Sequence, residues 1–170
     1  MEPYLLLFSS AIQYYVAGRY AVFAELNPTA ANLLHHAVEM CLKAALAKKG
    51  QTLAELKKHS HRIEDIWNEF RATHAGDFNR CDRIIAELHK FESIRYPDEI
   101  EKGGLESVVG RGSPPASQRV GNPKGHELYL GEIDDLIVQI SAAASIKLKA
   151  FTTSNTSYQQ FLEEENDSIR

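Results

Sequence analysis

Apolar residues recur along this chain at intervals of three and four positions, which is the spacing of amphipathic α-helices. The pattern predicts long helices over residues 4–24, 28–49, 78–93 and 129–150, with two shorter helices between residues 52 and 73. No segment of the sequence shows the alternation of apolar and polar residues that indicates a strand. We therefore expect an all-α fold, an antiparallel bundle of about five helices with one long loop.

Residues typical of helix ends stand at the boundaries of these ranges. Asn27 is the expected cap of the second helix, directly before a proline that suits the first helical turn. Gly50 is expected to end that helix in a left-handed conformation. The following helices have predicted caps in Thr52, which has the capping-box spacing to Glu55, in Ser60 and in Asp77.

Residues 95–126 differ in composition from the rest of the chain. They hold six of the ten glycines and four of the six prolines, which predicts one long Gly/Pro-rich loop, alternatively with a short hairpin around 108–109 and 119–120. Connections of this length are uncommon in compact domains and are usually functional or disordered. Residues 107–125 of this loop contain three basic residues, Arg111, Arg119 and Lys124, and no acidic residue.

We expect residues 1–150 to form one bundle domain that includes this loop, and residues 151–170 to form a polar, acidic tail. Two interpretations apply to the tail. It is a frayed, solvated end, or it forms a short helix that docks on the bundle or on a neighbour through Tyr158, Phe161 and Leu162.

Composition excludes several classes of protein. The 170 residues carry a formal net charge of -4, so a basic field over the whole surface is absent. No apolar run approaches the length of a membrane span, and no signal peptide is recognisable. We expect a cytoplasmic protein without a membrane partner. Cys41 and Cys81 lie within apolar helical patterns and are predicted to be buried, reduced thiols.

We expect no metal ion and no cofactor. His35 and His36 are adjacent on a helix and diverge by about 100°, so they do not converge on one ion, and one of them is expected to pack or to face a partner. Glu39 and Lys43 stand four residues apart on the same helix. They form either an exposed salt bridge of about 0.3–0.5 kcal/mol or a polar pair facing a cleft, with Lys43 available to a phosphate.

Three short motifs carry a family resemblance. Residues 32–44 read NLLHHAVEMCLKA and are followed by Gly50, residues 61–66 read HRIEDI, and residues 95–98 read RYPD. In this order they resemble the HEPN family, the higher eukaryote and prokaryote nucleotide-binding domains. In that family a helix with Glu and Lys four apart precedes a histidine near a helix start and then an Arg-Tyr-Pro motif. The resemblance covers roughly residues 4–150.

The resemblance implies an antiparallel helical bundle, often a homodimer, with a role linked to RNA or nucleotides. Many members of the family are metal-independent ribonucleases of toxin–antitoxin, CRISPR-associated or antiviral systems. Others bind RNA or nucleotides, or partner a small nucleotidyltransferase. Active members share an Arg-x4-6-His motif, in which the histidine transfers protons and the arginine stabilises phosphate charge during attack by a ribose 2′-hydroxyl.

Two pairs have that spacing and are the candidate catalytic residues: Arg83 with His89, and Arg119 with His126. Arg83 and His89 lie six positions apart on a predicted helix and so point about 120° apart, which opposes convergence on one phosphate. Arg119 and His126 lie on the glycine-rich loop, where spacing imposes no geometry. Arg95 of the RYPD motif has no histidine four to six positions later.

The candidate ligand-binding residues are cationic or aromatic. His61 lies in a basic stretch and either hydrogen-bonds within the bundle or contacts phosphate. Arg95 pairs with an acid such as Glu39 or binds phosphate, and Tyr96 packs or stacks on a base. The full set is Lys43, His61, Arg95, Tyr96 and Arg111.

These observations predict a non-catalytic HEPN-like module that forms a homodimer and binds RNA, a nucleotide or a partner protein such as a nucleotidyltransferase. The alternative is a metal-independent endoribonuclease of the toxin–antitoxin or defence type. A third interpretation is a helical protein-interaction domain without a nucleic-acid role, which the acidic charge balance favours.

Overall fold

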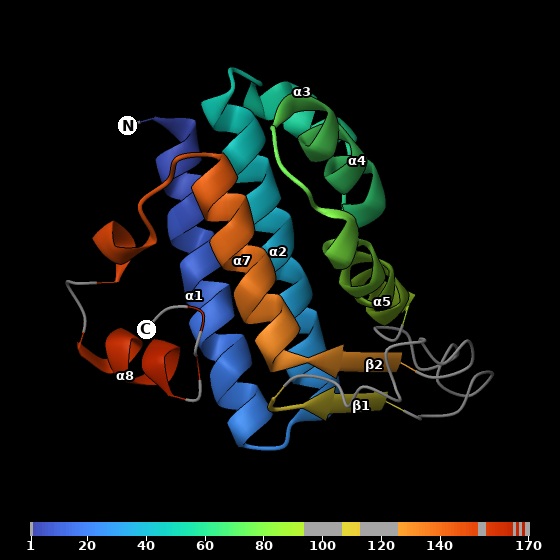
Figure 1. Ribbon diagram of the computed structural model, residues 1–170, viewed down its shortest axis with the longest axis vertical. Helices are drawn as coiled ribbons and strands as arrows, with labels where there is room; N and C mark the ends of the chain where they lie inside the picture. Colours follow the sequence, from blue (N-terminus) through green and yellow to red (C-terminus); the bar gives the residue numbers. More distant parts are fainter. Residues whose placement is uncertain are drawn as a thin grey trace.

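Three long helices run along the centre of the molecule (Figure 1). They are α1 (Pro3–Phe23), α2 (Asn27–Lys48) and α7 (Leu130–Ala143). The structure is a computed structural model that describes residues 2–93, 107–112, 126–152, 156–164, 166 and 168. A short turn joins α1 to α2, so these two helices are antiparallel, and they pack along their length.

The other helices flank this central group. On the side of α2 away from α1 lie α3 (Leu53–Lys58), α4 (Ile63–Thr73), the 3-10 turn η1 (Asn79–Cys81) and α5 (Asp82–Ser93), whereas a second 3-10 turn η3 (Leu148–Phe151) and α8 (Thr156–Glu163) lie on the α1 side. The predicted all-α class is confirmed, with α1, α2, α4, α5 and α7 as its main helices. Among the described residues, no helix combines the length and apolar character needed to cross a membrane.

The core forms where the predicted apolar stripes of these helices meet. The apolar stripe predicted over residues 78–93 is buried as expected, although residues 79–81 form the 3-10 turn η1 and α5 begins only at Asp82: its members are Phe78, Cys81, Ile84, Ile85, Leu88 and Phe91. Trp67 on α4 is also part of the core, where it stacks on Phe70 and donates a hydrogen bond to Asp82 Oδ1 at 2.8 Å. Cys41 and Cys81 are buried free thiols, as predicted. Burial raises the pKa of Cys41 to about 12 and that of Cys81 to about 11.

Two of the predicted helix ends are confirmed and three are wrong. Gly50 adopts a φ of 107°, and Thr52 forms the predicted capping box. Asn27 is not the cap of α2, because the tight turn after α1 places Leu26 there, with its carbonyl accepting from the N–H of Ala30 at 2.8 Å. Ser60 does not cap α4 either, since it lies in the left-handed region, two residues before the N-cap. Asp77 does not stand at an N-cap, because η1 has Phe78 there and α5 begins at Asp82, but its Oδ1 accepts from the N–H of Asn79 at 3.2 Å.

Two short strands lie within and at the end of the predicted long loop. β1 (Ser107–Gly110) pairs with β2 (His126–Tyr129) in parallel, with Val109 opposite Leu128. The hairpin suggested for residues 108–109 is therefore wrong, because this segment pairs in parallel with residues 126–129. Residues 119–120 lie outside the described part of the chain. Neither strand alternates apolar and polar residues, since β1 reads SVVG and β2 reads HELY, so periodicity gives no strand signal there. Parallel pairing is open to them because the intervening chain is long enough for a crossover.

The last long helix ends earlier than predicted. α7 stops at Ala143, and Ser145 has a φ of 53°. The N–H of Ile146 then donates to the Ser141 carbonyl at 2.8 Å, which closes the helix end as in a Schellman motif. Glycine is the usual residue at this position, so the serine gave no sequence signal for the end of the helix.

The tail docks on the bundle, which agrees with the prediction of a docked short helix and not with that of a solvated end. Asn166 is fully buried and donates a hydrogen bond to Tyr15 Oη on α1 at 3.0 Å. Arg19 on α1 is also fully buried, donates to the carbonyl of Glu164 and forms an ion pair with Asp134 on α7. Burial raises the pKa of Asp134, and the arginine opposes this effect.

Gly18 sets the closest approach of α1 to α2. A Cβ atom at this position would lie 2.8 Å from Cδ2 and 3.3 Å from the backbone nitrogen of Leu34, which is fully buried. The absence of a side chain at Gly18 therefore allows the two central helices to pack at this distance.

We expect Gly18→Val to lower the free energy of unfolding by about 2 kcal/mol or more, because neither Leu34 nor its backbone can retreat from the added methyl groups. Urea unfolding followed by circular dichroism measures the change. The control is Ala72→Val at an exposed position of α4, which should cost only about 0.5 kcal/mol of helix propensity. Equal losses in the two variants would contradict the close approach.

Candidate functional site

A fully buried carboxylate, Glu39 on α2, is surrounded by four nitrogen-bearing side chains. Its Oε1 accepts a hydrogen bond from Lys43 Nζ at 2.6 Å, and its Oε2 lies 3.0 Å from His61 Nδ1. On the same helix, His36 Nδ1 is 3.5 Å and His35 Nε2 is 3.7 Å from Oε2. We call these five residues the Glu39 cluster.

Helical spacing accounts for four members of the cluster. His35, His36 and Lys43 lie four before, three before and four after Glu39, and residues at these separations share one face of a helix. Both Glu39 and Lys43 are in the interior, with the lysine side chain 9% exposed, so they are a buried polar pair and not an exposed salt bridge.

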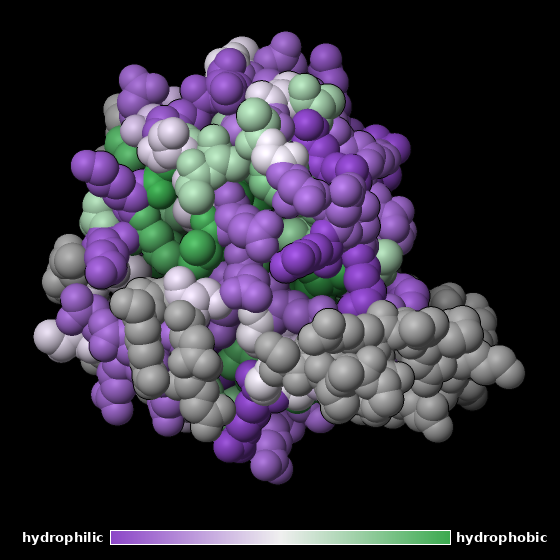
Figure 2. All heavy atoms as spheres, in the orientation of Figure 1, coloured by the Kyte–Doolittle hydropathy of each residue, from purple (hydrophilic) through white to green (hydrophobic). Residues whose placement is uncertain are grey.

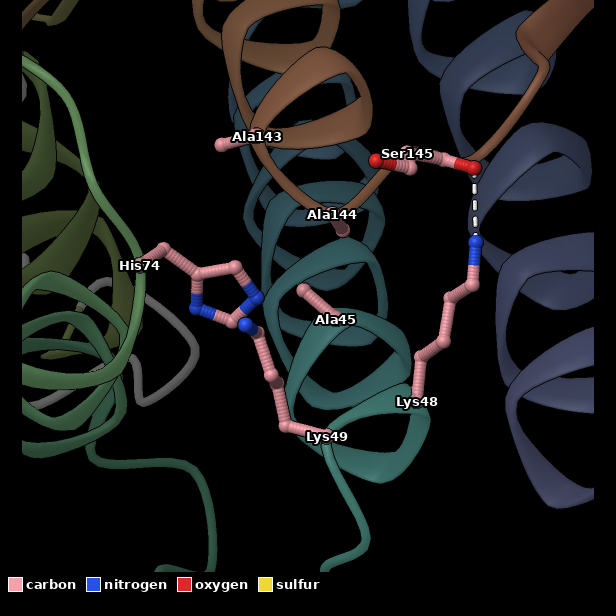
Figure 3. Close-up of a pocket in the computed structure, with 7 residues that line it drawn as sticks. All are labelled: Ala45, Lys48, Lys49, His74, Ala143, Ala144 and Ser145. Atoms are coloured by element: carbon pink, nitrogen blue, oxygen red, sulfur yellow. Dashed lines mark hydrogen bonds between the residues drawn. The ribbon is translucent and has the colours of Figure 1, made fainter.

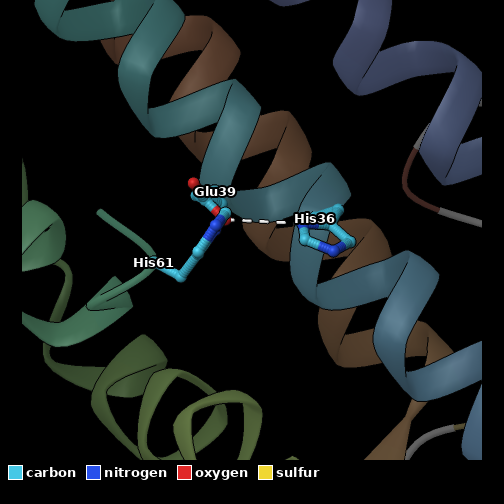
Figure 4. A group of neighbouring side chains, drawn as sticks. All are labelled: His36, Glu39 and His61. Atoms are coloured by element: carbon cyan, nitrogen blue, oxygen red, sulfur yellow. Dashed lines mark hydrogen bonds and ion pairs between the residues drawn. The ribbon is translucent and has the colours of Figure 1, made fainter. Parts of the chain in front are cut away.

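The fifth member arrives from the turn between α3 and α4. Lys43 Nζ also donates to the carbonyl of Ser60 at 2.7 Å, and Ser60 has a φ of 52°. This left-handed residue turns the chain so that His61 reaches Glu39 from the opposite side to His36 (Figure 4). The buried lysine therefore connects the turn to the carboxylate of α2.

The ionisation of Glu39 follows from these contacts. Burial alone would raise the pKa of this carboxyl, but the hydrogen bonds with His36, Lys43 and His61 and the charge of Lys43 outweigh it and lower the pKa to about 2. Glu39 is therefore ionised at neutral pH although it has no contact with water.

Two histidines of the cluster reach the surface and one does not. The side chain of His61 is 47% exposed and that of His36 is 24% exposed. His35 is buried, with Nδ1 at 3.0 Å from the carbonyl of Leu88, so one of the adjacent histidines packs inside, as expected. The ring of His36 also lies 5.3 Å from that of Tyr14 on α1, measured between centroids, and Tyr14 is 39% exposed.

This arrangement suits three kinds of chemistry. An imidazole whose Nδ1 faces a carboxylate is held in one orientation, and its Nε2 remains available for a proton or a phosphate oxygen. Alternatively, its Nδ1 and the carboxylate oxygen can ligate one metal ion together. Such a group acts as an acid or base, as a hydrogen-bond donor to an anion, or as a ligand. The Glu39 cluster offers two of these imidazoles at one place on the surface.

The structure does not bring Arg83 and His89 together. Arg83 forms an ion pair with Glu132 of α7, whereas His89 lies 4.0 Å from Glu64 of α4. The two side chains of α5 therefore engage different neighbouring helices, which agrees with their predicted divergence. For the second predicted pair, Arg119 and the side chain of His126 lie outside the described residues.

The remaining predicted ligand-binding residues fall into three groups. Lys43 and His61 belong to the Glu39 cluster. Arg111 is exposed, lies over the ring of Phe23 at the end of α1 and is 3.7 Å from Glu25. Arg95 and Tyr96, including the suggested pairing of Arg95 with Glu39, lie outside the described residues.

An open hollow of about 240 Å³ lies where α2 and α7 end (Figure 3), lined by Ala45, Lys48, Lys49, His74, Ala143, Ala144 and Ser145. His74 is buried, which lowers its pKa, and its Nε2 has no hydrogen-bond partner among the described residues. Lys48 donates to the carbonyl of Ser145 at 2.6 Å. The hollow is smaller than the roughly 300–1,000 Å³ of typical ligand sites, and one of its cations is already engaged, so we place the site at the Glu39 cluster.

Comparison with known proteins does not assign the chain to a family. A scan against models of known protein families finds no match for the chain, and searches of curated proteins and of solved structures find none either.

We expect Glu39→Gln to lower the free energy of unfolding by about 3–5 kcal/mol at pH 7, because it leaves Lys43 buried without a counter-charge. Because Glu39 has a pKa of about 2 in the folded chain against an ordinary 4.5, its contribution of about 3 kcal/mol is present above pH 4.5 and is lost as the pH falls from 4.5 towards 2. The variant should therefore lose less stability than the native chain over that range, measured by urea unfolding.

Two further variants make this measurement specific. Glu64→Gln removes a half-exposed carboxylate of α4 and should change stability by less than about 1 kcal/mol. The double variant Glu39→Gln/Lys43→Met should recover part of the loss, since it no longer buries an unpaired charge. Equal stabilities for Glu39→Gln and Glu64→Gln would contradict the buried ion pair.

Proposed function

We propose that the chain is a HEPN-like helical module that forms a homodimer and binds single-stranded RNA or a nucleotide without cleaving it. The observation that carries this proposal is a line of three rings that reach the surface, with the middle one, His36, partly exposed. Tyr14 lies beside His36, and His36 lies beside His61, with centroids 5.3 and 5.7 Å apart. Exposed aromatic rings next to basic side chains are the usual surface for single-stranded nucleic acid.

The basic side chains are supplied by the turn between α3 and α4. Residues 57–62 read KKHSHR and contain no acid, and Lys57 and Lys58 are exposed within four residues of His61. Figure 2 shows that hydrophilic side chains predominate on the side of the molecule formed by α3, α4 and α5. A phosphate backbone along this turn would bring its bases towards His36 and Tyr14.

The proposal is non-catalytic because Arg83 and His89, the predicted catalytic pair whose side chains the structure describes, engage different helices. We also propose a reducing cytoplasmic location, since Cys41 and Cys81 are both free thiols. The partner protein that we propose is a nucleotidyltransferase, as the family resemblance implies.

Binding of a fluorescent single-stranded RNA oligonucleotide, measured in EDTA, tests the proposal. We expect Tyr14→Ala to weaken binding about 5- to 150-fold, because a stacked base contributes about 1–3 kcal/mol. Lys57→Ala/Lys58→Ala should reduce the slope of log Kd against log salt concentration by about 0.7 for each lost phosphate contact. The matched control Lys147→Ala/Lys149→Ala removes two exposed lysines near η3 and should leave the slope unchanged.

Two outcomes oppose this assignment. No measurable affinity for RNA or for nucleotides would favour the protein-interaction domain. Equal effects of the two double-lysine variants would show that binding is non-specific attraction to any basic surface.

One observation favours a second function, the metal-independent ribonuclease. Two histidines beside one carboxylate are the residue types that transfer protons during attack of a 2′-hydroxyl on the adjacent phosphate. RNA cleavage in EDTA decides between the two functions, with His36→Ala/His61→Ala and Arg83→Ala/His89→Ala compared with the native chain. If the native chain cleaves RNA and His36→Ala/His61→Ala does not, the chain is a nuclease and not a binding module. If none of the three proteins cleaves RNA, the result supports the binding module.

The homodimer is proposed through the outward face of α1. A seam on this face follows the four–three spacing of a coiled coil and carries no charge, at Leu6, Ser10, Gln13, Ala17, Tyr20 and its C-cap Ala24. All but Ser10 are exposed, with Leu6 at 53% and Tyr20 at 55%. An uncharged seam with small side chains is self-complementary across a two-fold axis, which suits a second copy of the chain.

We expect Ala17→Glu to convert the dimer to a monomer, because two carboxylates would face each other across the axis. Light scattering after size-exclusion chromatography measures the mass. The control Asn68→Glu adds the same charge at an exposed position of α4 and should leave the dimer intact. A native chain that is monomeric at high micromolar concentration would contradict this interface.

A further inference from the structure

We propose that His36, Glu39 and His61 form a binding site for one divalent transition-metal ion of the zinc type. Each of these side chains offers one ligand atom, and the three atoms lie within 4.8 Å of one another. Figure 4 shows the two imidazoles on either side of the carboxylate, with His36 and Glu39 from α2 and His61 from the turn before α4. The proposal goes beyond nucleotide binding and does not depend on it.

The distances are close to those that a tetrahedral ion requires. Bonds of about 2.1 Å at tetrahedral angles place the ligand atoms about 3.4 Å apart. Glu39 Oε2 lies 3.5 Å from His36 Nδ1 and 3.0 Å from His61 Nδ1. The two distances from the carboxylate oxygen to the histidine nitrogens are therefore close to those around a bound ion. Rotation of the partly exposed imidazole rings brings the two histidine nitrogens to the same spacing from each other.

The donor set selects the class of ion. Two imidazole nitrogens with one carboxylate oxygen are ligands that zinc and its neighbours in the first transition row bind well, whereas magnesium and calcium prefer all-oxygen sites. Three protein ligands leave a fourth position open. This position would face solvent, because the side chains of His61 and His36 are 47% and 24% exposed.

Lys43 holds the carboxylate in place for such an ion. Its Nζ bonds to Oε1, the oxygen that faces away from the histidines, so Oε2 remains directed at both rings. Groups that hydrogen-bond to a metal-binding carboxylate orient it in this way. The lysine also carries its charge on the far side of the carboxylate from the proposed ion, which limits repulsion between the two cations.

Titration of untagged, EDTA-treated protein with Co²⁺ and Zn²⁺, without RNA, tests the site. We expect one Co²⁺ per chain, with the strong visible absorption of a four-coordinate ion, which Zn²⁺ displaces. His61→Ala and His36→Ala should each weaken binding by more than the about 10–100-fold that loss of an outer hydrogen-bond partner causes. The matched control is His59→Ala, which removes an imidazole that pairs with Glu69, two residues from His61, and should bind as the native chain does.

The outcomes separate clearly. Binding lost in both ligand variants and kept in the control supports the site. Absence of a 1:1 complex, or binding that His59→Ala weakens as much as His61→Ala, overturns it. If His36→Ala unfolds, His61→Ala decides alone, because its half-exposed side chain is replaced without opening the core. RNA binding is measured in EDTA, so failure of either proposal leaves the other standing.

Discussion

The carboxylate of Glu39 is ionised in the interior of the protein, and a buried charge without partners would cost several kcal/mol. The polar groups in contact with this carboxylate offset that cost. Lys43 supplies the counter-charge from the same helix, and His61 supplies a hydrogen bond from the turn between α3 and α4. Because Lys43 also holds the Ser60 carbonyl, the position of the turn depends on the same charge.

A second buried polar network fixes the other side of the bundle. Arg19 on α1 and Asp134 on α7 are paired without exposure to water, and Tyr15 donates to the same carboxylate. Asn166 joins this network from the tail. The first network joins α2 to the turn before α4, and the second joins α1 to α7 and the tail. Each therefore restricts how the elements that it connects can shift against one another. Burial of polar groups at two points therefore favours one arrangement of the bundle.

The proposed surfaces of the protein are neighbours. Tyr14 contacts His36 of the Glu39 cluster, and on α1 it is directly adjacent in sequence to Gln13 of the uncharged seam. In a dimer formed through that seam, the ring surface of each chain would lie beside the interface. A ligand bound to the proposed ring surface of one copy would then be close to the partner chain.

The sequence by itself determined the helices, their apolar faces, the two buried thiols and the capping box at Thr52, because these depend on contacts within four residues. It also indicated three histidines, Glu39 and Lys43 as chemistry-bearing residues, but not their convergence. Only the tertiary structure decided that His61 meets Glu39 across 22 positions and that Tyr15 meets Asp134 across 119. The parallel strands, the helix end at Ser145 and the docked tail were likewise decided by packing between distant segments, for which local periodicity carries no signal.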